Sequence, residues 1–249
     1  MQLTVLGSAA SYPDAGRACS GHLVRSGETS VLLDCGNGVL ANLGKVIDPT
    51  HLSAVFISHA HVDHFADVYA LQAALRYAPA GPVAPLPLYA PSGVFELMQR
   101  ALTEHGAHEL AEAFEVHELA PGAPVRVGKL TVTPHPVDHV GTTFALVVDE
   151  GDARLCYTSD TRAGDAVAAA ASGALVLLAD ATLPPAYAGR APHMTAFEAA
   201  LLAQEAGART LVLTHLWPTV DRVEAAEQAR EAFGGRVIVA DEMDTLDIE

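Results

Sequence analysis

The chain carries little positive charge. Its 249 residues include 14 Lys and Arg against 30 Asp and Glu, so the formal net charge is −16. Proteins that bind nucleic acid through its phosphates generally gather Lys and Arg on one surface. No such cluster is visible in this sequence, and aromatic and basic residues are not interleaved. The composition therefore argues against nucleic acid as a partner.

The sequence also lacks long apolar runs and a disulfide framework. No stretch approaches the roughly 20 apolar residues of a membrane span. A strand is expected at residues 2–6, with no basic segment and apolar stretch before it, which favours a non-secreted protein. The three cysteines, Cys19, Cys35 and Cys156, are odd in number and widely spaced. This usage is typical of free thiols in a reducing cytosol. We therefore expect a cytoplasmic protein without membrane contact.

The residues that are present predict a compact α/β fold. Half of the chain is hydrophobic and 18% is charged, which is enough for a large core. No linker rich in Gly, Ser or charge divides it, so residues 1–249 are expected to form one domain. Neither half can bury its apolar sheet face alone, which predicts a four-layer αββα sandwich of two mixed sheets. Strands are expected near 2–6, 22–25, 30–34, 54–58, 113–118, 129–134, 143–148, 154–158, 174–179, 210–214 and 236–240, with one further short strand near Leu88 in the loop at 79–91. Helices are expected near 64–77, 92–103, 164–171, 195–206 and 221–233.

The segment HAHVDH at residues 59–64 is the most informative part of the sequence. His59, His61, Asp63 and His64 place four potential metal ligands within six residues. The segment follows an apolar run that predicts a strand and precedes a predicted helix, which is where α/β folds build active sites. Such a cluster would be costly to bury unless a cation offset its desolvation. It therefore predicts a metal site.

Three later residues are candidates to complete that site. His139 follows the apolar run at 130–133, Asp160 follows the run at 154–158, and His215 follows the run at 210–214. Each would lie at the end of a strand. Asp34, at another strand end, and His135, in the turn before His139, are expected to hold ligand rings by hydrogen bonds or to be structural.

These motifs resemble those of the metallo-β-lactamase superfamily, in the phosphodiesterase branch that includes ribonuclease Z, the tRNA 3′-processing endonuclease. The openings LTVLGS at 3–8 and LLDCG at 32–36 are similar to its first strands. YTSDT at 157–161 is similar to its bridging-aspartate motif, although Gly is more usual where Ser159 stands. HMT at 193–195 is similar to its additional histidine motif. Asp160, rather than Cys, points away from the antibiotic-hydrolysing members.

The resemblance implies a site with two divalent metal ions. His and carboxylate ligands suit zinc, and they also accept manganese or iron. Two metals can share a hydroxide that attacks phosphorus, with Asp63 orienting it or taking its proton. The resemblance assigns His59, His61 and His139 to one metal, Asp63, His64 and His215 to the other, and Asp160 to both.

His193 is a further candidate catalytic residue. Thr195 and Glu198 form a capping-box pattern, which predicts a helix over 196–206 with Thr195 as its N-cap. His193 would precede this helix, whose dipole favours anions. It is expected to touch a phosphate oxygen or to protonate a leaving alkoxide. The alternative is a surface histidine in a loop flanked by prolines.

The predicted substrate is a small phosphodiester, such as a 3′,5′-cyclic nucleotide. Ribonuclease Z enzymes typically carry a long tRNA-gripping arm between the motifs of His139 and Asp160, but only 21 positions separate these residues here. Trp217, beside a candidate ligand, is expected to stack on a base or to pack in the core. The loop at 79–91 is a second candidate for base contact.

Other functions remain open on the sequence alone. The same site would serve an endonuclease acting on RNA 3′ ends, a lactone or thioester hydrolase, or a redox diiron protein. A non-catalytic metal-binding partner protein is the alternative from another class. By analogy with relatives, a homodimer is also an expectation.

Overall fold

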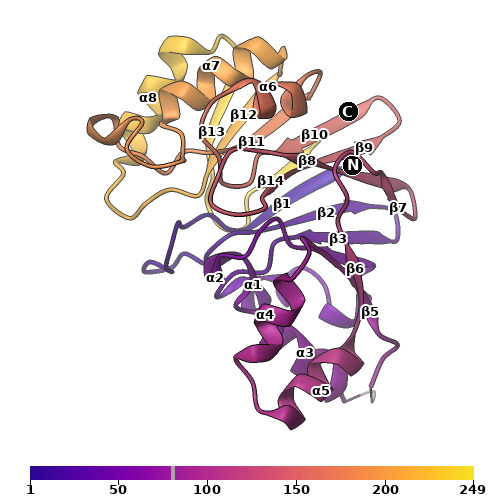
Figure 1. The fold of residues 1–249 in the computed structure, drawn as a ribbon. Coiled ribbons are helices and arrows are strands. Elements are labelled where there is room, and N and C mark those ends of the chain that lie inside the picture. Colours follow the sequence, from indigo (N-terminus) through magenta and orange to yellow (C-terminus); the bar gives the residue numbers. More distant parts are fainter. Residues whose placement is uncertain (80–81) are drawn as a thin grey trace.

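The computed structural model describes residues 1–79 and 82–249. Two seven-stranded sheets pack face to face, and helices cover the outer face of each sheet (Figure 1). Three apolar clusters separate the four layers. The αββα sandwich expected from the sequence is confirmed.

The first sheet comes mainly from the N-terminal half and has the strand order β14-β1-β2-β3-β4-β5-β6. Strands β3 to β6 are parallel, and the other pairs are antiparallel. The strands are β1 (Gln2–Gly7), β2 (Gly21–Ser26), β3 (Thr29–Leu33), β4 (Ala54–Phe56), β5 (Leu86–Ala90), β6 (Phe114–Glu118) and β14 (Thr245–Asp247). The helices of this half are α1 (Val39–Leu43), η1 (Pro49–His51), α2 (Val62–Phe65), α3 (Val68–Arg76), α4 (Val94–Arg100) and α5 (Glu104–Ala113).

The second sheet comes from the C-terminal half and has the order β13-β12-β11-β10-β9-β8-β7. Strands β10 to β13 are parallel, and β7 to β10 are antiparallel. The strands are β7 (Val125–Val127), β8 (Leu130–Pro136), β9 (Phe144–Glu150), β10 (Ala153–Tyr157), β11 (Val176–Asp180), β12 (Thr210–Thr214) and β13 (Arg236–Val239). Its helices are α6 (Asp165–Ala171), η2 (Pro185–Tyr187), α7 (Ala196–Ala206) and α8 (Arg222–Ala232).

Strand β4 shows how the sequence builds both faces of the first sheet. Ala54 and Phe56 point into the core between the sheets, while Val55 and Ile57 point toward the helices. This follows from the two-residue repeat of a strand, and all four side chains are fully buried. Burying one large apolar side chain stabilises a fold by about 1.5–3 kcal/mol. The strand is therefore firmly held just before the histidine cluster.

Several expected elements differ in the structure. The helical region expected near 64–77 contains two helices, the end of α2 and the whole of α3, and between them the Asp67 backbone N–H donates to the Cys35 carbonyl. Helix α5 and strand β14 were not expected. Strand β14 forms by pairing with β1 at the other end of the chain. Helix α7, its N-cap Thr195 and the capping box with Glu198 are confirmed.

The loop expected at 79–91 contains the short strand expected near Leu88, which is confirmed as β5. Ala80 and Gly81 lie outside the described residues, and β5 occupies Leu86–Ala90. Strand β5 runs parallel to β4. The first residue of β5 therefore lies at the opposite end of these strands from the end at which β4 leads to His59. A base-contacting role for this loop stays a prediction.

None of the helices in residues 1–79 and 82–249 has the length and hydropathy that crossing a membrane requires.

Candidate metal centre

Seven His and Asp side chains converge where strands of the two sheets end. They come from the loops after β4, β8, β10 and β12. Asp160 faces both sides of the cluster: its Oδ2 lies 3.6 Å from His59 Nε2 and its Oδ1 lies 3.3 Å from His64 Nε2. In the described residues, three groups each bring one ligand atom per residue within 4.8 Å of all the others in the group. One is His59, His61, His139 and Asp160, another is Asp63, His64 and His215, and the third is Asp160, Asp180, His193 and His215.

The hydrogen bonds around His59 fix which ring nitrogen faces the centre. The Ser58 hydroxyl donates to Asp34 Oδ2 at 2.8 Å, because a carboxylate oxygen accepts. Ser58 Oγ therefore accepts the 3.0 Å hydrogen bond from His59 Nδ1. This leaves the lone pair of His59 on Nε2, pointing toward Asp160.

His139 and His215 are oriented in the same way. His139 Nδ1 donates to the Pro192 carbonyl at 3.0 Å. Thr182 Oγ1 donates to Asp180 Oδ1 or to the His215 carbonyl, so its lone pair accepts from His215 Nδ1 at 2.8 Å. Both rings therefore turn the lone pair on Nε2 toward the cluster.

The inward-facing nitrogens lie close to one another. His139 Nε2 is 3.3 Å from His61 Nδ1, and His64 Nε2 is 3.3 Å from His215 Nε2. Lone pairs at this distance repel unless a proton or a metal ion lies between them. Among the described residues, buried His59 Nε2 and Asp160 Oδ1 have no hydrogen-bond partner. Unpaired buried polar atoms are costly, and a cation would satisfy both. The donor set therefore fits divalent metals.

Burial and neighbouring charges shift the pKa values of the clustered residues. Burial and the charge of His64 hold the pKa of His59 well below its usual value, so its ring stays neutral. Burial would raise the pKa of Asp160, but His215 and His64 hold it well below its usual range. Burial opposes the charged form of His64, yet Asp160 and Asp34 raise its pKa well above the usual value. Proton binding and metal binding therefore compete at His64 Nε2.

The buried carboxylate of Asp34 forms hydrogen bonds that orient two histidines of the centre. Its Oδ2 lies 2.7 Å from His64 Nδ1 and accepts from the Tyr157 hydroxyl at 2.8 Å. Its Oδ1 accepts from the Ser58 backbone N–H at 2.7 Å. One buried carboxylate thus orients His64 directly and His59 through Ser58. The buttressing role expected from its strand-end position matches these contacts.

Replacing Asp34 with asparagine tests this support. An amide cannot accept all of these hydrogen bonds, so we expect metal affinity to fall about 10–100-fold. Titration against a chelator of known affinity measures the change. Tyr157→Phe, which removes one donor and leaves the carboxylate, serves as the control and is expected to cost less. Unchanged affinity in Asp34→Asn would contradict the role.

Asp180 is a candidate functional residue that the sequence analysis missed. This fully buried residue ends β11, and its Oδ2 lies 2.8 Å from His193 Nδ1. Burial would lower the pKa of His193, but the hydrogen bond and charge of Asp180 raise it above the usual value. The His193 ring stacks on His215, with centroids 5.7 Å apart. Asp180 follows an apolar run, so the strand-end rule that found Asp160 would also have found it.

Backbone strain is concentrated at the centre. In the described residues, five non-glycine residues have a positive φ: Ser11, Asp34, Ser159, His215 and Met243. The first four lie at the cluster or contact it, since the Ser11 N–H donates to Asp63 Oδ2 at 2.7 Å. Such conformations are costly and gather at functional sites.

The left-handed φ of 54° at Ser159 explains why glycine is more usual there. Ser159→Gly is expected to relieve about 1 kcal/mol of strain and to raise the melting temperature by about 2–4 °C. The His59 ring keeps its 3.0 Å contact with Ser58, so turnover should stay within about twofold. Ser172→Gly, at a φ of −52°, is the matched control and should gain nothing. A lower melting temperature in Ser159→Gly would contradict the strain argument.

Other predicted residues have different positions. His193 lies beside the cluster, and Trp217 packs against Tyr187 near it. His135 lies on β8, where burial and Arg154 lower its pKa, and it forms no hydrogen bond with a ligand ring in the described part of the chain.

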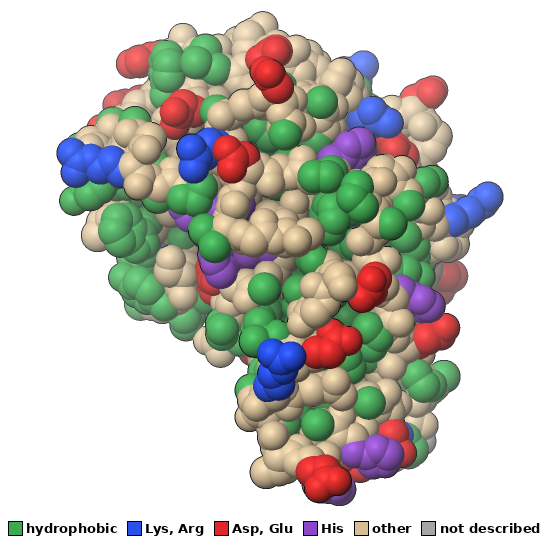
Figure 2. All heavy atoms as spheres, in the orientation of Figure 1, with side chains coloured by type: hydrophobic (Ala, Val, Ile, Leu, Met, Phe, Trp, Pro, Cys, Tyr) green, Lys and Arg blue, Asp and Glu red, His purple; other side chains and the backbone are tan. Residues whose placement is uncertain are grey.

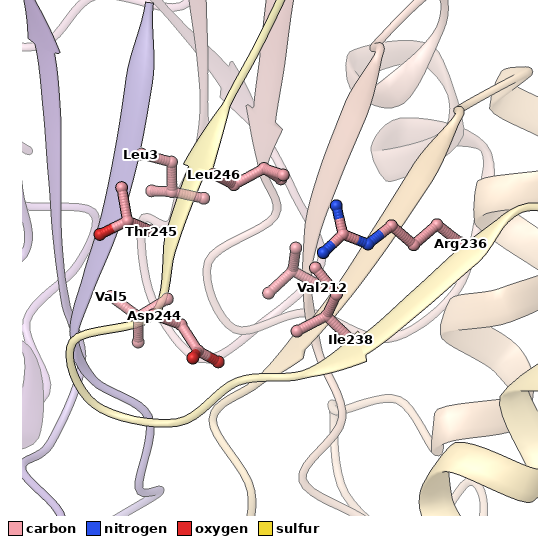
Figure 3. Close-up of a pocket in the computed structure, with 8 residues that line it drawn as sticks. All are labelled: Leu3, Val5, Val212, Arg236, Ile238, Asp244, Thr245 and Leu246. Carbon is pink, nitrogen blue, oxygen red and sulfur yellow. The ribbon is translucent and has the colours of Figure 1, made fainter.

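Figure 2 shows histidine side chains recessed between the two halves, with hydrophobic side chains gathered at the left. The cleft in Figure 3 is separate: it lies between β1, β14, β12 and β13 and contains no candidate ligand.

Comparisons with known proteins agree with the fold. The family model described as "Beta-lactamase superfamily domain" matches residues 29–216. The chain therefore belongs to this superfamily and is a hydrolase of the metallo-β-lactamase fold.

Relatives are similar over nearly their whole length. The probable metallo-hydrolase YhfI of Bacillus subtilis strain 168 is 32% identical over 244 residues, which cover 96% of this chain and 97% of YhfI. The crystal structure of YhfI superimposes with a TM-score of 0.88 at 30% identity, covering 99% of each chain. Ribonuclease Z of Mycobacterium bovis BCG Pasteur 1173P2 is 29% identical over 279 residues, covering 100% of this chain and 98% of the relative.

Proposed function

We propose that this protein is a phosphodiesterase dependent on two divalent metal ions, and that it hydrolyses a small phosphodiester such as a 3′,5′-cyclic nucleotide. The observation that carries the proposal is the convergence of seven His and Asp side chains in which Asp160 lies between two groups, with Oδ2 3.6 Å from His59 Nε2 and Oδ1 3.3 Å from His64 Nε2. We propose zinc as the native metal, with manganese and iron as alternatives that the same ligands accept.

The two metals and Asp63 are proposed to have different roles in the reaction. Two divalent metals, when bound, polarise the phosphoryl group and lower the pKa of water. Asp63 Oδ2 lies 3.2 Å from His215 Nε2, and the charges of His215 and His64 hold the pKa of Asp63 below its usual range against the effect of burial. An ionised Asp63 is suited to bind metal and to accept a proton from the attacking water.

His193 is proposed to act on the leaving group. Its Nδ1 is held by Asp180, so Nε2 is the nitrogen that remains to face the substrate. Asp180 raises the pKa of His193, which favours the protonated ring. A protonated Nε2 can donate to a phosphoryl oxygen and then protonate the departing alkoxide.

The short connection between His139 and Asp160 supports a small substrate. Strands β9 and β10 form an antiparallel hairpin that fills this interval. The 279 aligned positions of the ribonuclease Z relative exceed the 249 residues of this chain by 30. The net charge of −16 also disfavours a long RNA.

An RNA 3′-end endonuclease is the second candidate, because one relative bears the name ribonuclease Z. Comparing kcat/KM for 3′,5′-cyclic AMP with that for a precursor tRNA carrying a 3′ trailer separates the two. The proposal predicts turnover of the cyclic nucleotide and little cleavage of the RNA. The reverse result would select the endonuclease.

A further inference from the structure

Two aromatic side chains and an arginine gather on the loops that carry site residues. Tyr187 lies on the loop between β11 and α7, and Trp217 lies two residues beyond His215. Their ring centroids are 6.2 Å apart, with an interplanar angle of 88°. The guanidinium carbon of Arg190 lies 5.2 Å from the Tyr187 ring centroid. We call Tyr187, Arg190 and Trp217 the aromatic platform.

The loop that carries Tyr187 and Arg190 leads directly into residues of the metal centre. The Tyr187 N–H donates to the Pro184 carbonyl at 2.9 Å, and the Arg190 N–H donates to the Tyr187 carbonyl at 3.0 Å. Two residues after Arg190, the Pro192 carbonyl accepts from His139 Nδ1. The next residue, His193, is held by Asp180. The loop is therefore tied both to a ligand ring and to the proposed acid.

Two side chains of the platform, Tyr187 and Arg190, are exposed to solvent. Tyr187 is 44% exposed, so its ring is accessible to a ligand. Arg190 is also exposed and forms no ion pair in the described residues, whereas Arg17 and Arg222 are both paired with Asp241. The Arg190 guanidinium lies over the Tyr187 ring. It offers both a planar stacking surface and hydrogen-bond donors.

We infer that the aromatic platform binds the nucleobase attached to the scissile phosphate, an inference that rests on the proposed function. A base has a π face that stacks on aromatic rings and guanidinium planes, and acceptor atoms on its edge. Tyr187 and Trp217 supply the rings, and Arg190 supplies the donors. The sequence analysis named base stacking as one role for Trp217 alone. Together with Tyr187 and Arg190, Trp217 forms a three-residue site that selects substrates bearing a base.

The single tryptophan provides a direct test. We would titrate metal-loaded protein with adenosine 5′-monophosphate and with ribose 5-phosphate, and follow Trp217 fluorescence. The nucleotide should quench it and bind about tenfold more tightly than the sugar phosphate, which lacks the base. Tyr187→Ala and Arg190→Ala should each weaken nucleotide binding, the first by about tenfold.

Tyr77→Ala is the matched control, because Tyr77 is an exposed tyrosine at the end of α3 in the other half of the chain. It should leave nucleotide affinity unchanged. Equal affinity for the nucleotide and the sugar phosphate would overturn the inference. So would unchanged nucleotide affinity in Tyr187→Ala, or no quenching at millimolar nucleotide.

Turnover of 3′,5′-cyclic AMP by the same preparation separates this inference from the proposed function. If the platform is right, Tyr187→Ala raises KM about tenfold and changes kcat little. Quenching without turnover would keep the platform and reject the phosphodiesterase. Turnover with an unchanged KM in Tyr187→Ala would keep the phosphodiesterase and reject the platform.

Discussion

Replacing Asp63 with alanine is expected to lower kcat about 10³-fold or more. The variant loses both a candidate ligand of the second metal and the proposed proton acceptor, and acid–base catalysis alone contributes about 10²–10⁴-fold. It also removes the acceptor of the Ser11 N–H, at 2.7 Å. Steady-state turnover of a cyclic nucleotide, together with metal content per chain, measures the effect.

The metal content shows which function of Asp63 was lost. His59, His61, His139 and Asp160 form a separate group, so one metal should remain bound in Asp63→Ala. Asp152→Ala, in the turn between β9 and β10, removes a carboxylate far along the hairpin and should leave turnover unchanged. Turnover of Asp63→Ala within tenfold of the parent protein would contradict the assignment.

His193→Ala is expected to lower kcat about 10²–10⁴-fold while both metals stay bound. Its ring packs on His139 and His215, and one of its nitrogens lies within 4.8 Å of ligand atoms of Asp160, Asp180 and His215, but it belongs to neither of the two ligand groups proposed here. The loss should be largest for substrates with a poor leaving group, because these need protonation most. A nitrophenolate leaving group, which departs without a proton, should recover much of the rate.

Asp180→Asn refines this test. The amide keeps a hydrogen bond to His193 Nδ1 but removes the charge that raises the pKa of His193. We expect an intermediate loss of kcat with little change in KM. His108→Ala, on the exposed face of α5, is the control for losing a histidine. Loss of metal in His193→Ala, or an unchanged kcat, would contradict its role as an acid.

The sequence predicted the fold and the gathering of the candidate ligands because both follow local rules. Apolar runs mark the strands, and polar residues just after them meet at one edge of the sandwich. His59, His139, Asp160 and His215 all obey this rule. Their roles as ligands stay a prediction until metal binding is measured.

Non-local features could not be predicted in the same way. The pairing of β14 with β1 joins the two ends of the chain. The tautomers of the ligand rings depend on Ser58, Thr182 and the Pro192 carbonyl, which approach only after folding. The contact of Tyr187 with Trp217 likewise joins separate loops. Asp180 was within reach of the strand-end rule and was overlooked.

The most direct test of the account is product formation from 3′,5′-cyclic AMP by protein loaded with Zn²⁺ or Mn²⁺, with Asp63→Ala measured beside it. The account predicts release of the monophosphate by the loaded protein, loss of this activity on chelation, and almost none in Asp63→Ala. No turnover of any phosphodiester by protein that holds two metals per chain would contradict it. That result would favour a lactone or thioester substrate, or a metal-binding partner protein.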